Sequence, residues 1–360
     1  MRRAAIVGTG AIATSHAEAL RSAGDRVELV AVVDVDIERA QAFAATWGVR
    51  RAYDSLAAVL DEERLDVVHV CTPPRLHVPQ ALECLMADVH VLMEKPPALS
   101  LSEMDLLIAA ERDSAGRVAT VFQHRFGPAA VRLRRMIADG VLGRSLVAKC
   151  DTLWYRGDAY FEVPWRGTWN SEGGGPTMGH GIHQFDLLLS ILGPWQEIRA
   201  VAARRARNVQ TEDVSMALVT FADGTVASVV NSLLSPRETS ELRLDFEHAT
   251  VELQHLYGYT DAHWTVTPVP GHDEVVTRWQ TGRSEIVSDH RCQLAAFLDA
   301  LDSGVAPPVT LADTRNTMEF IASLYASAFT GTVVRAGQIG PDSPFYASME
   351  GSGAPWASAR

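Results

Sequence analysis

Two histidines follow a run of glycines in the middle of the chain, where residues 173–186 read GGGPTMGHGIHQFD. An imidazole gains and loses a proton near neutral pH, so His183 could serve as a general acid or base. His180, His183 and Asp186 could instead hold zinc, but two histidines three apart differ from the four-residue spacing of helical zinc sites. We expect no metal here. The remaining interpretation is that both histidines pack in a polar core.

The segment after the glycines has the apolar spacing of a helix and ends at Gly193-Pro194. On this helix His180, His183 and Asp186 would form one ridge, so Asp186 could orient the imidazole of His183. Glycine lets a backbone approach a ligand closely. We therefore expect residues 173–175 to line the crevice that holds the reacting groups.

A glycine-rich turn near the N-terminus could hold a dinucleotide. Residues 4–7 are apolar, residues 8–13 read GTGAIA, and a helical pattern follows. In a strand–turn–helix of this kind, Gly8 permits the tight turn and Gly10 lets the pyrophosphate approach the backbone. The helix, which we expect to begin at about Ala11, would point its free N–H groups at the phosphates.

A carboxylate ends the second apolar run, which covers residues 27–33. At this place Asp34 could accept hydrogen bonds from the ribose hydroxyls of the adenosine, and it would repel a 2′-phosphate. No cation stands next to it, because Val35 and Asp36 follow. We therefore expect NAD as the cofactor rather than NADP. The alternative is that Asp34 only caps the helix that begins after it.

These residues need a scaffold that brings the ends of several strands together. Apolar runs at residues 66–70, 89–93 and 118–122 alternate with helical patterns, which is typical of a doubly wound parallel sheet. Ligands bind beyond the carboxyl ends of such strands. In the second half, strand patterns predict a further sheet with one face for the core and one for a partner subunit. They cover residues 215–221, 225–233, 241–247 and 250–253, with a hairpin turn at Asp223-Gly224, and helices follow at residues 290–301 and 312–330.

Bulk properties narrow the function further. A chain of 360 residues predicts two domains. Its formal net charge of −12 disfavours nucleic-acid binding. We expect no membrane span, because the sequence has no apolar run of about 20 residues. The four cysteines show no paired spacing and predict a reducing compartment, the cytoplasm; they are Cys71, Cys84, Cys150 and Cys292.

Five motifs in the same order resemble the Gfo/Idh/MocA family, named after glucose–fructose oxidoreductase, inositol dehydrogenase and a rhizopine catabolism protein. They are the GTGAIA turn, CTPP at residues 71–74 with His77, Glu94-Lys95-Pro96, the glycine–histidine block, and the tail DTRNTMEFIASLYASAFTG. The resemblance implies an α/β protein with an N-terminal Rossmann domain, residues 1–124, built on a doubly wound parallel sheet. It also implies a C-terminal α/β domain, residues 125–360, with a large open, mostly antiparallel sheet that assembles homodimers or homotetramers. A C-terminal helix could pack back on the first domain.

The resemblance also assigns roles to single residues. Lys95 matches the catalytic-site lysine, and His183 matches the histidine that serves as acid or base. The family's aspartate, four residues before this histidine, falls on Gly179, and we expect His180 to share the space that it leaves. The residues expected to bind the cofactor are Gly8, Gly10, Ala11, Ile12, Asp34, Thr72, Pro73, His77, Glu94 and Lys95.

Aromatic residues interspersed with arginines precede the glycine block. They suit a sugar ring, which stacks on aromatic faces while its hydroxyls meet polar groups. Trp165 and Arg166 are the first candidates for contact with the substrate or with the nicotinamide ribose, and the weaker candidates for substrate contact are Arg125, Tyr155, Arg156, Trp169 and Asp186. The alternative is that the aromatic side chains anchor the core. No role is assigned to His255, His263, His272 and His290.

The combined prediction is an NAD-dependent oxidoreductase that transfers a hydride between nicotinamide and a secondary alcohol or ketone of a sugar, cyclitol or glycoside. His183 would act as acid or base, and Lys95 would stabilise the developing oxyanion. Two alternatives remain open. One is a glycoside-cleaving enzyme that oxidises a ring carbon transiently, and the other is a non-catalytic, NAD-binding regulatory protein.

Overall fold

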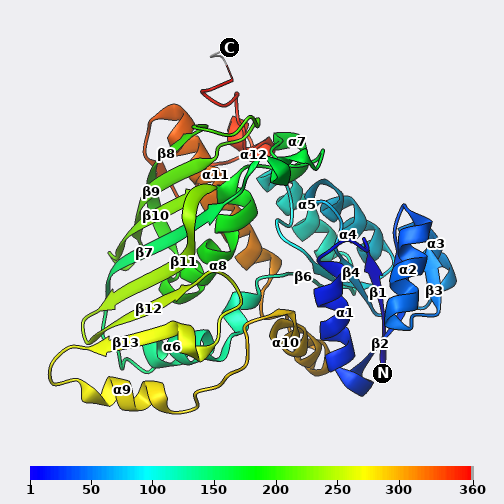
Figure 1. Ribbon diagram of the computed structural model, residues 1–360, viewed down its shortest axis with the longest axis horizontal. Coiled ribbons are helices and arrows are strands. Elements are labelled where there is room, and N and C mark those ends of the chain that lie inside the picture. The colour runs from blue at the N-terminus through cyan, green and yellow to red at the C-terminus, as the bar shows by residue number, and fades with distance from the viewer. Residues whose placement is uncertain (358–360) are drawn as a thin grey trace. The chain divides into compact units, whose positions relative to one another are not determined.

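The computed structural model describes residues 1–357, and the chain forms two compact units (Figure 1). Unit 1 consists of Met1–Val121 and His290–Arg315, and unit 2 consists of Phe122–Asp289 and the residues from Asn316 onward. The expected boundary after residue 124 lies close to the first of these junctions. The return of residues 290–315 to unit 1 means that unit 2 interrupts unit 1 in the sequence.

Unit 1 is built on a parallel sheet of six strands in the order β3-β2-β1-β4-β5-β6, which is the order of doubly wound dinucleotide-binding folds. Its central strands are buried on both faces, and this explains why they read as continuous apolar runs. The expected strands are present, and β3 is an additional short strand at one edge. The strands are β1 (Arg2–Val7), β2 (Val27–Val33), β3 (Arg51–Tyr53), β4 (Val67–Val70), β5 (His90–Met93) and β6 (Val118–Thr120).

The core of unit 1 includes helix α10, which follows unit 2 in the sequence. Leu294, Phe297 and Leu298 of α10 are buried with Ala17 and Leu20 of α1 in one apolar cluster. Helix α1 begins at Ala13, two residues later than the expected start at about Ala11. The helices of unit 1 are α1 (Ala13–Ser22), α2 (Ile37–Trp47), α3 (Leu56–Glu62), α4 (His77–Met86), α5 (Leu101–Arg112) and α10 (His290–Ser303).

Unit 2 is built on an eight-stranded sheet in the order β13-β12-β11-β7-β10-β9-β8-β14. All neighbouring strands run antiparallel except β7 and β10, which are parallel. The expected hairpin turn joins β9 to β10, with Gly224 at a φ of 91°. The strands are β7 (Ser145–Tyr155), β8 (Trp195–Ala203), β9 (Val214–Phe221), β10 (Val226–Ser232), β11 (Leu234–Phe246), β12 (Ala249–His255), β13 (Trp264–Pro268) and β14 (Val334–Arg335).

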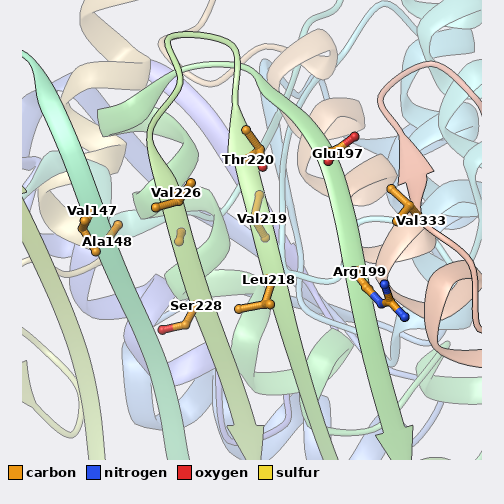
Figure 2. A pocket seen from close by; sticks show the side chains of 11 residues that line it. Val147, Ala148, Glu197, Arg199, Leu218, Val219, Thr220, Val226, Ser228 and Val333 are labelled. Atoms are coloured by element: carbon orange, nitrogen blue, oxygen red, sulfur yellow. The ribbon is translucent and has the colours of Figure 1, made fainter.

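The two faces of the second sheet differ. Side chains that alternate along β9 are buried on one face, such as Ala217 and Val219, while Leu218 is 65% exposed on the other. Figure 2 shows Val226, Leu218 and Arg199 on the neighbouring strands β10, β9 and β8, where they line a hollow in this exposed face. The helices that include residues of unit 2 are α6 (Pro128–Ala138), α7 (Trp169–Glu172), α8 (Ile182–Leu192), α9 (Asp273–Gln280), α11 (Leu311–Thr330) and α12 (Pro344–Ala347). None of the helices within residues 1–357 has the length and apolar character needed to span a bilayer.

Candidate active site

The glycine turn of unit 1 connects β1 to α1. Gly8 has a φ of 89°, and a Cβ added to it would lie 2.9 Å from the carbonyl carbon and oxygen of Cys71, so both conformation and space require glycine here. Gly10 is exposed, and nothing lies within 4 Å of where its Cβ would stand. Ala11 is exposed and Ile12 partly buried on the same turn. The turn therefore offers open backbone of the kind that a pyrophosphate approaches.

Asp34 lies at the end of β2 beside this turn. The backbone N–H and the hydroxyl of Thr9 both donate to its Oδ2 at 2.9 Å, so the carboxylate connects the end of β2 to the glycine turn. Burial alone would raise the pKa of Asp34, but hydrogen bonds from Arg39, Thr9 and the Asp36 backbone outweigh burial and lower it to about 2. The carboxylate is therefore ionised and remains an acceptor.

The structure excludes the alternative role of Asp34 and corrects the expectation that no cation stands beside it. Asp34 does not cap helix α2: the cap is Asp36, whose side chain accepts from the backbone N–H of Arg39. A cation does accompany Asp34, because the Nε of Arg39 donates to its Oδ2 at 3.0 Å. Arg39 is five residues from Asp34 in the sequence and reaches back to it from the first turn of α2.

The turns after β4 and β5 are tied together by His77. Its ring nitrogens lie 2.7 Å from the carbonyl oxygens of Pro96 and Thr72, and the side chain is buried. Thr72 and Pro73 remain partly exposed on the first turn. His77 thus holds two loops at the carboxyl ends of neighbouring strands.

Glu94 is buried at the end of β5 and accepts three hydrogen bonds. His16 Nε2 and His290 Nε2 lie 3.0 and 2.9 Å from its Oε1, and the backbone N–H of Lys95 donates to its Oε2 at 3.1 Å. Burial would raise the pKa of Glu94, but the two histidines hold it well below its usual range. The carboxylate thus fixes the backbone from which Lys95 extends, and the side chain of Lys95 is partly exposed.

Sequence reasoning missed both histidines of this cluster and assigned no role to His290. The available signal was a polar residue, His16, on the buried face of α1. His69 Nδ1 lies 2.8 Å from His16 Nδ1, and burial lowers the pKa of both rings. Neutral His16 donates to Glu94 through Nε2, so His69 must donate to His16. Imidazole and carboxylate atoms within 4.8 Å of one another would also suit a metal ion, but here each donor already has an acceptor.

In unit 2, the expected single helical ridge is interrupted. Residues Thr177–Gly181 form a π-helical turn, and α8 begins only at Ile182. The α-helical spacing that would align His180 with His183 does not hold across this junction. The prediction of one ridge was therefore wrong.

The two histidines have different neighbours. The ring of His180, which is partly exposed, lies 5.0 Å from that of Trp154 and 6.0 Å from that of Tyr160. The ring of His183 is buried and lies 5.3 Å from that of His124 and 5.5 Å from that of Tyr257. Ring–ring contacts thus surround both histidines with aromatic surface in unit 2.

Asp186 forms a buried ion pair with Arg125. Its two oxygens accept from Nε and Nη2 of Arg125, each at 2.6 Å, and the carboxylate is almost completely buried. Two expected substrate contacts, Asp186 and Arg125, are therefore engaged with each other. A bidentate pair of this kind fixes the segment before α6 to α8.

Gly174 and Gly175 pack against protein rather than facing a ligand crevice. A Cβ on Gly175 would lie 2.0 Å from the carbonyl oxygen of Glu212. The buried Glu212 carboxylate accepts from the backbone N–H groups of Gly175 and Thr177, each at 3.1 Å, and from the Tyr325 hydroxyl at 2.8 Å. Burial raises the pKa of Glu212. Gly175 thus approaches Glu212 closely, and Gly174 approaches Tyr325, so for these two glycines the expectation that they line the reactive crevice was wrong.

The aromatic segment before the glycines divides into exposed and buried parts. Tyr155 is exposed, while Trp165 and Arg166 are partly exposed. Trp169 is buried, and its ring packs edge-on against Tyr325 at 5.3 Å. Trp169 therefore serves the core, which is the alternative weighed for this residue.

Comparison with known proteins decides the family. Residues 2–122 match the family described as "Oxidoreductase family, NAD-binding Rossmann fold", and residues 130–252 match the "GFO/IDH/MocA C-terminal domain". The chain belongs to the Gfo/Idh/MocA family. This family, which has an NAD-binding fold, includes oxidoreductases that act on sugars and cyclitols.

Among Gfo/Idh/MocA relatives, D-glucoside 3-dehydrogenase of Escherichia coli (strain K12) is 30% identical over 361 residues, covering 92% of this chain and 97% of that protein. Myo-inositol 2-dehydrogenase of Thermotoga maritima is 27% identical over 242 residues, which cover 64% of this chain and 68% of that protein. The crystal structure of the WlbA dehydrogenase from Bordetella pertussis, in complex with NADH and UDP-GlcNAcA, matches with a TM-score of 0.83 at 25% identity, covering 92% and 98%.

Unit 1 fits the nicotinamide dinucleotide that Gfo/Idh/MocA membership implies. The open space over Gly10 suits a pyrophosphate, and the ionised Asp34 suits ribose hydroxyls. Unit 2 departs from the Gfo/Idh/MocA pattern at Gly179, where nothing lies within 4 Å of an added Cβ. Packing therefore does not force glycine there, and its absent side chain leaves free volume one residue before His180.

Proposed function

We propose that the protein is an NAD-dependent dehydrogenase that transfers a hydride between nicotinamide and a secondary alcohol or ketone of a sugar, cyclitol or glycoside. The observation that carries this proposal is the match along almost the full length of both chains to a D-glucoside 3-dehydrogenase. Lys95 and His183 are both present in this chain at the positions that the family resemblance assigns to catalysis.

The choice of NAD over NADP rests on Asp34. An ionised, buried carboxylate at the end of β2 accepts hydrogen bonds from ribose hydroxyls and repels a 2′-phosphate. Arg39 does not reverse this preference, because its guanidinium is already paired with the same carboxylate. NAD is therefore the cofactor that this pair favours.

The reaction needs a proton acceptor and a positive charge besides the cofactor, which supplies the hydride acceptor when bound. His183 takes the hydroxyl proton in oxidation and returns it in reduction. Lys95 places an ammonium group where negative charge develops on the carbinol oxygen, and the Glu94 cluster holds its backbone.

A screen of NAD reduction tests the function. Absorbance of NADH should rise when the protein and NAD meet a set of glucosides, free sugars and inositols. Release of nitrophenol from nitrophenyl glycosides without net NADH would instead indicate a glycosidase that oxidises its substrate transiently. Tight NAD binding without either reaction would indicate a binding protein.

His183→Ala tests the assigned base on the substrate found by the screen. Loss of a general base lowers kcat by about 10²- to 10⁴-fold, whereas the dissociation constant for NAD should change little. His255→Ala is the matched control, because this exposed ring stacks on His263 and has no proposed role. A near-normal kcat for His183→Ala would remove His183 from the mechanism.

The exposed face of the second sheet supports a proposal about assembly. Met216, Leu218 and Val226 leave about half or more of their surface exposed there, and exposed apolar surface of this kind commonly marks an interface. We propose that a second copy of the chain covers this face and forms a homodimer, or a homotetramer through further contacts. The cytoplasmic location expected from the cysteines stays a prediction.

A further inference from the structure

Arg166 is a half-buried cation that stacks on two aromatic rings. Its guanidinium carbon lies 3.7 Å from the centre of the Tyr160 ring and 4.7 Å from that of Trp165. Its Nε is shielded from solvent and forms no hydrogen bond within residues 1–357. The rings fix the plane of the guanidinium, while the partial exposure of the residue leaves it accessible.

The arginines around it are paired differently. Arg156 forms an ion pair of 2.9 Å with Glu238, and Arg207 lies 3.4 Å from Asp158. Across the described residues, Arg166 has no carboxylate within 4 Å, and Glu172 attracts it only from a distance. A chain with twelve more acidic than basic side chains thus leaves this cation without an ion pair.

Burial without a partner is unfavourable for a charge. Burial lowers the pKa of Arg166, and the nearby positive charge of Arg156 adds to this effect. An anion bound to the guanidinium would raise the pKa of Arg166 and so oppose both contributions. The planar fork of arginine matches a carboxylate or a phosphate group, with which it forms two parallel hydrogen bonds.

Arg166 is connected through the Tyr160 ring to His180, a candidate catalytic residue of unit 2. Tyr160, on which Arg166 stacks, lies 6.0 Å from the ring of His180. The ring of Trp154 also contacts the ring of His180, at a distance of 5.0 Å. A ligand group held by Arg166 would therefore be part of a molecule that extends along this aromatic surface.

We propose that Arg166 binds an anionic substituent of the substrate, a carboxylate or phosphate group, so that the protein prefers an acidic sugar derivative over a neutral one. This inference rests on the proposed dehydrogenase function and specifies its substrate class. Trp165 and Tyr160 hold the guanidinium in place, and the reacting hydroxyl belongs to the same molecule.

Competing pairs of substrates test the preference. Methyl glucoside is the neutral probe, methyl glucuronide carries the carboxylate, and glucose 6-phosphate carries the phosphate. We expect kcat/KM for one acidic probe to exceed that of methyl glucoside in the wild type. Arg166→Gln should lower this ratio by about 10- to 100-fold, the effect of losing a charge-assisted hydrogen bond. Because both probes compete in one preparation, a loss of folded protein leaves the ratio unchanged.

Arg237→Gln is the matched control, since it removes the same charge from an exposed position of unit 2. Its ratio should stay within about twofold of the wild-type ratio, because water and salt screen an exposed charge. Equal ratios in Arg166→Gln and Arg237→Gln would overturn the inference. So would a wild type that prefers the neutral glucoside, although NAD reduction would then still support the dehydrogenase.

A binding measurement separates failure of the inference from failure of the function. Glucuronate, glucose 6-phosphate and inorganic phosphate are added to the wild type and to Arg166→Gln, and the melting temperature is recorded. An acidic sugar that stabilises only the wild type supports the anion site even when no NADH is formed. The absence of any shift in the wild type would overturn it. A higher dissociation constant for NAD in Arg166→Gln would also overturn the inference. Arg166 would then bind the phosphates of the cofactor rather than a group of the substrate.

Discussion

Arg39 donates hydrogen bonds to both carboxylate oxygens of Asp34, with its Nε 3.0 Å from Oδ2. The same Oδ2 accepts from Thr9 in the glycine turn. One carboxylate thus connects the end of β2, the turn after β1 and the first turn of α2. A ribose hydroxyl that binds there donates to the same carboxylate as Arg39. The Asp34 carboxylate also keeps the Arg39 guanidinium in place.

Asp34→Asn should change the choice of cofactor. We expect the dissociation constant of NAD to rise about 10- to 100-fold, since hydrogen bonds to a charged group contribute about 1.5–3 kcal/mol. The dissociation constant of NADP should fall, because Arg39 becomes available for the 2′-phosphate. Fluorescence titration with both cofactors measures the two constants. The double variant Asp34→Asn/Arg39→Ala should lose the gain for NADP, and an unchanged NADP constant in the single variant would contradict this account.

The Asp34 interaction should also make stability depend on pH in acid. The pKa of Asp34 falls from 3.8 to about 2 on folding. Because the unfolded chain binds more protons between these values, the stabilisation is complete above about pH 4 and is lost as the pH falls toward 2. We therefore expect the difference in free energy of unfolding between wild type and Asp34→Asn to shrink below pH 4. The exposed Asp25→Asn serves as control, and a pH-independent difference for Asp34→Asn would refute the prediction.

Glu212→Ala should strongly destabilise unit 2. The substitution removes the acceptor of two backbone N–H groups and of the Tyr325 hydroxyl, all buried. At about 1–3 kcal/mol for each unsatisfied group, we expect a loss of roughly 3 kcal/mol or more. Thermal unfolding should move by about 6 °C or more. Glu252→Ala, which removes a partly exposed partner of Arg243, should change the midpoint little. Equal midpoints for the two variants would argue against the anchoring role.

Leu218→Asp should disrupt the proposed assembly. This side chain is 65% exposed in the isolated chain and lies in the hollow of the exposed sheet face. A carboxylate buried in an interface without a partner is strongly unfavourable. Light scattering coupled to size-exclusion chromatography should therefore show an oligomer for the wild type and a monomer for the variant. Val305→Asp places the same charge at another exposed apolar position and should leave the mass unchanged, whereas a wild-type monomer would exclude the proposed interface.

The sheets were predictable where burial leaves a simple pattern. Strands β2 and β4 are covered on both faces and therefore read as apolar runs. Strand β9 alternates between buried and exposed side chains and reads with a period of two. Strand β3 escaped prediction, because three residues at a sheet edge carry neither signal. The π-helical turn at residues 177–181 escaped as well, since a glycine-rich segment has too few side chains to show its period.

The composition of the site was less predictable than its location. The sequence indicated the turns that carry Gly8, Asp34 and Lys95, because each follows an apolar strand. It did not indicate that His290 would bond to Glu94 across 196 positions of the chain. Such pairs depend on how distant segments pack, and local periodicity contains no information about them.

Helix α10 has a consequence for the order in which the protein is made. Leu294, Phe297 and Leu298 complete the apolar cluster of unit 1, yet the ribosome adds them after all of Phe122–Asp289. The core of the nascent nucleotide-binding unit therefore stays incomplete and partly exposed to water while the first segment of unit 2 is synthesised. A transcript truncated before codon 290 would yield a chain whose first unit lacks helix α10 and exposes part of its apolar core. Such a product is a natural target for chaperones and proteases.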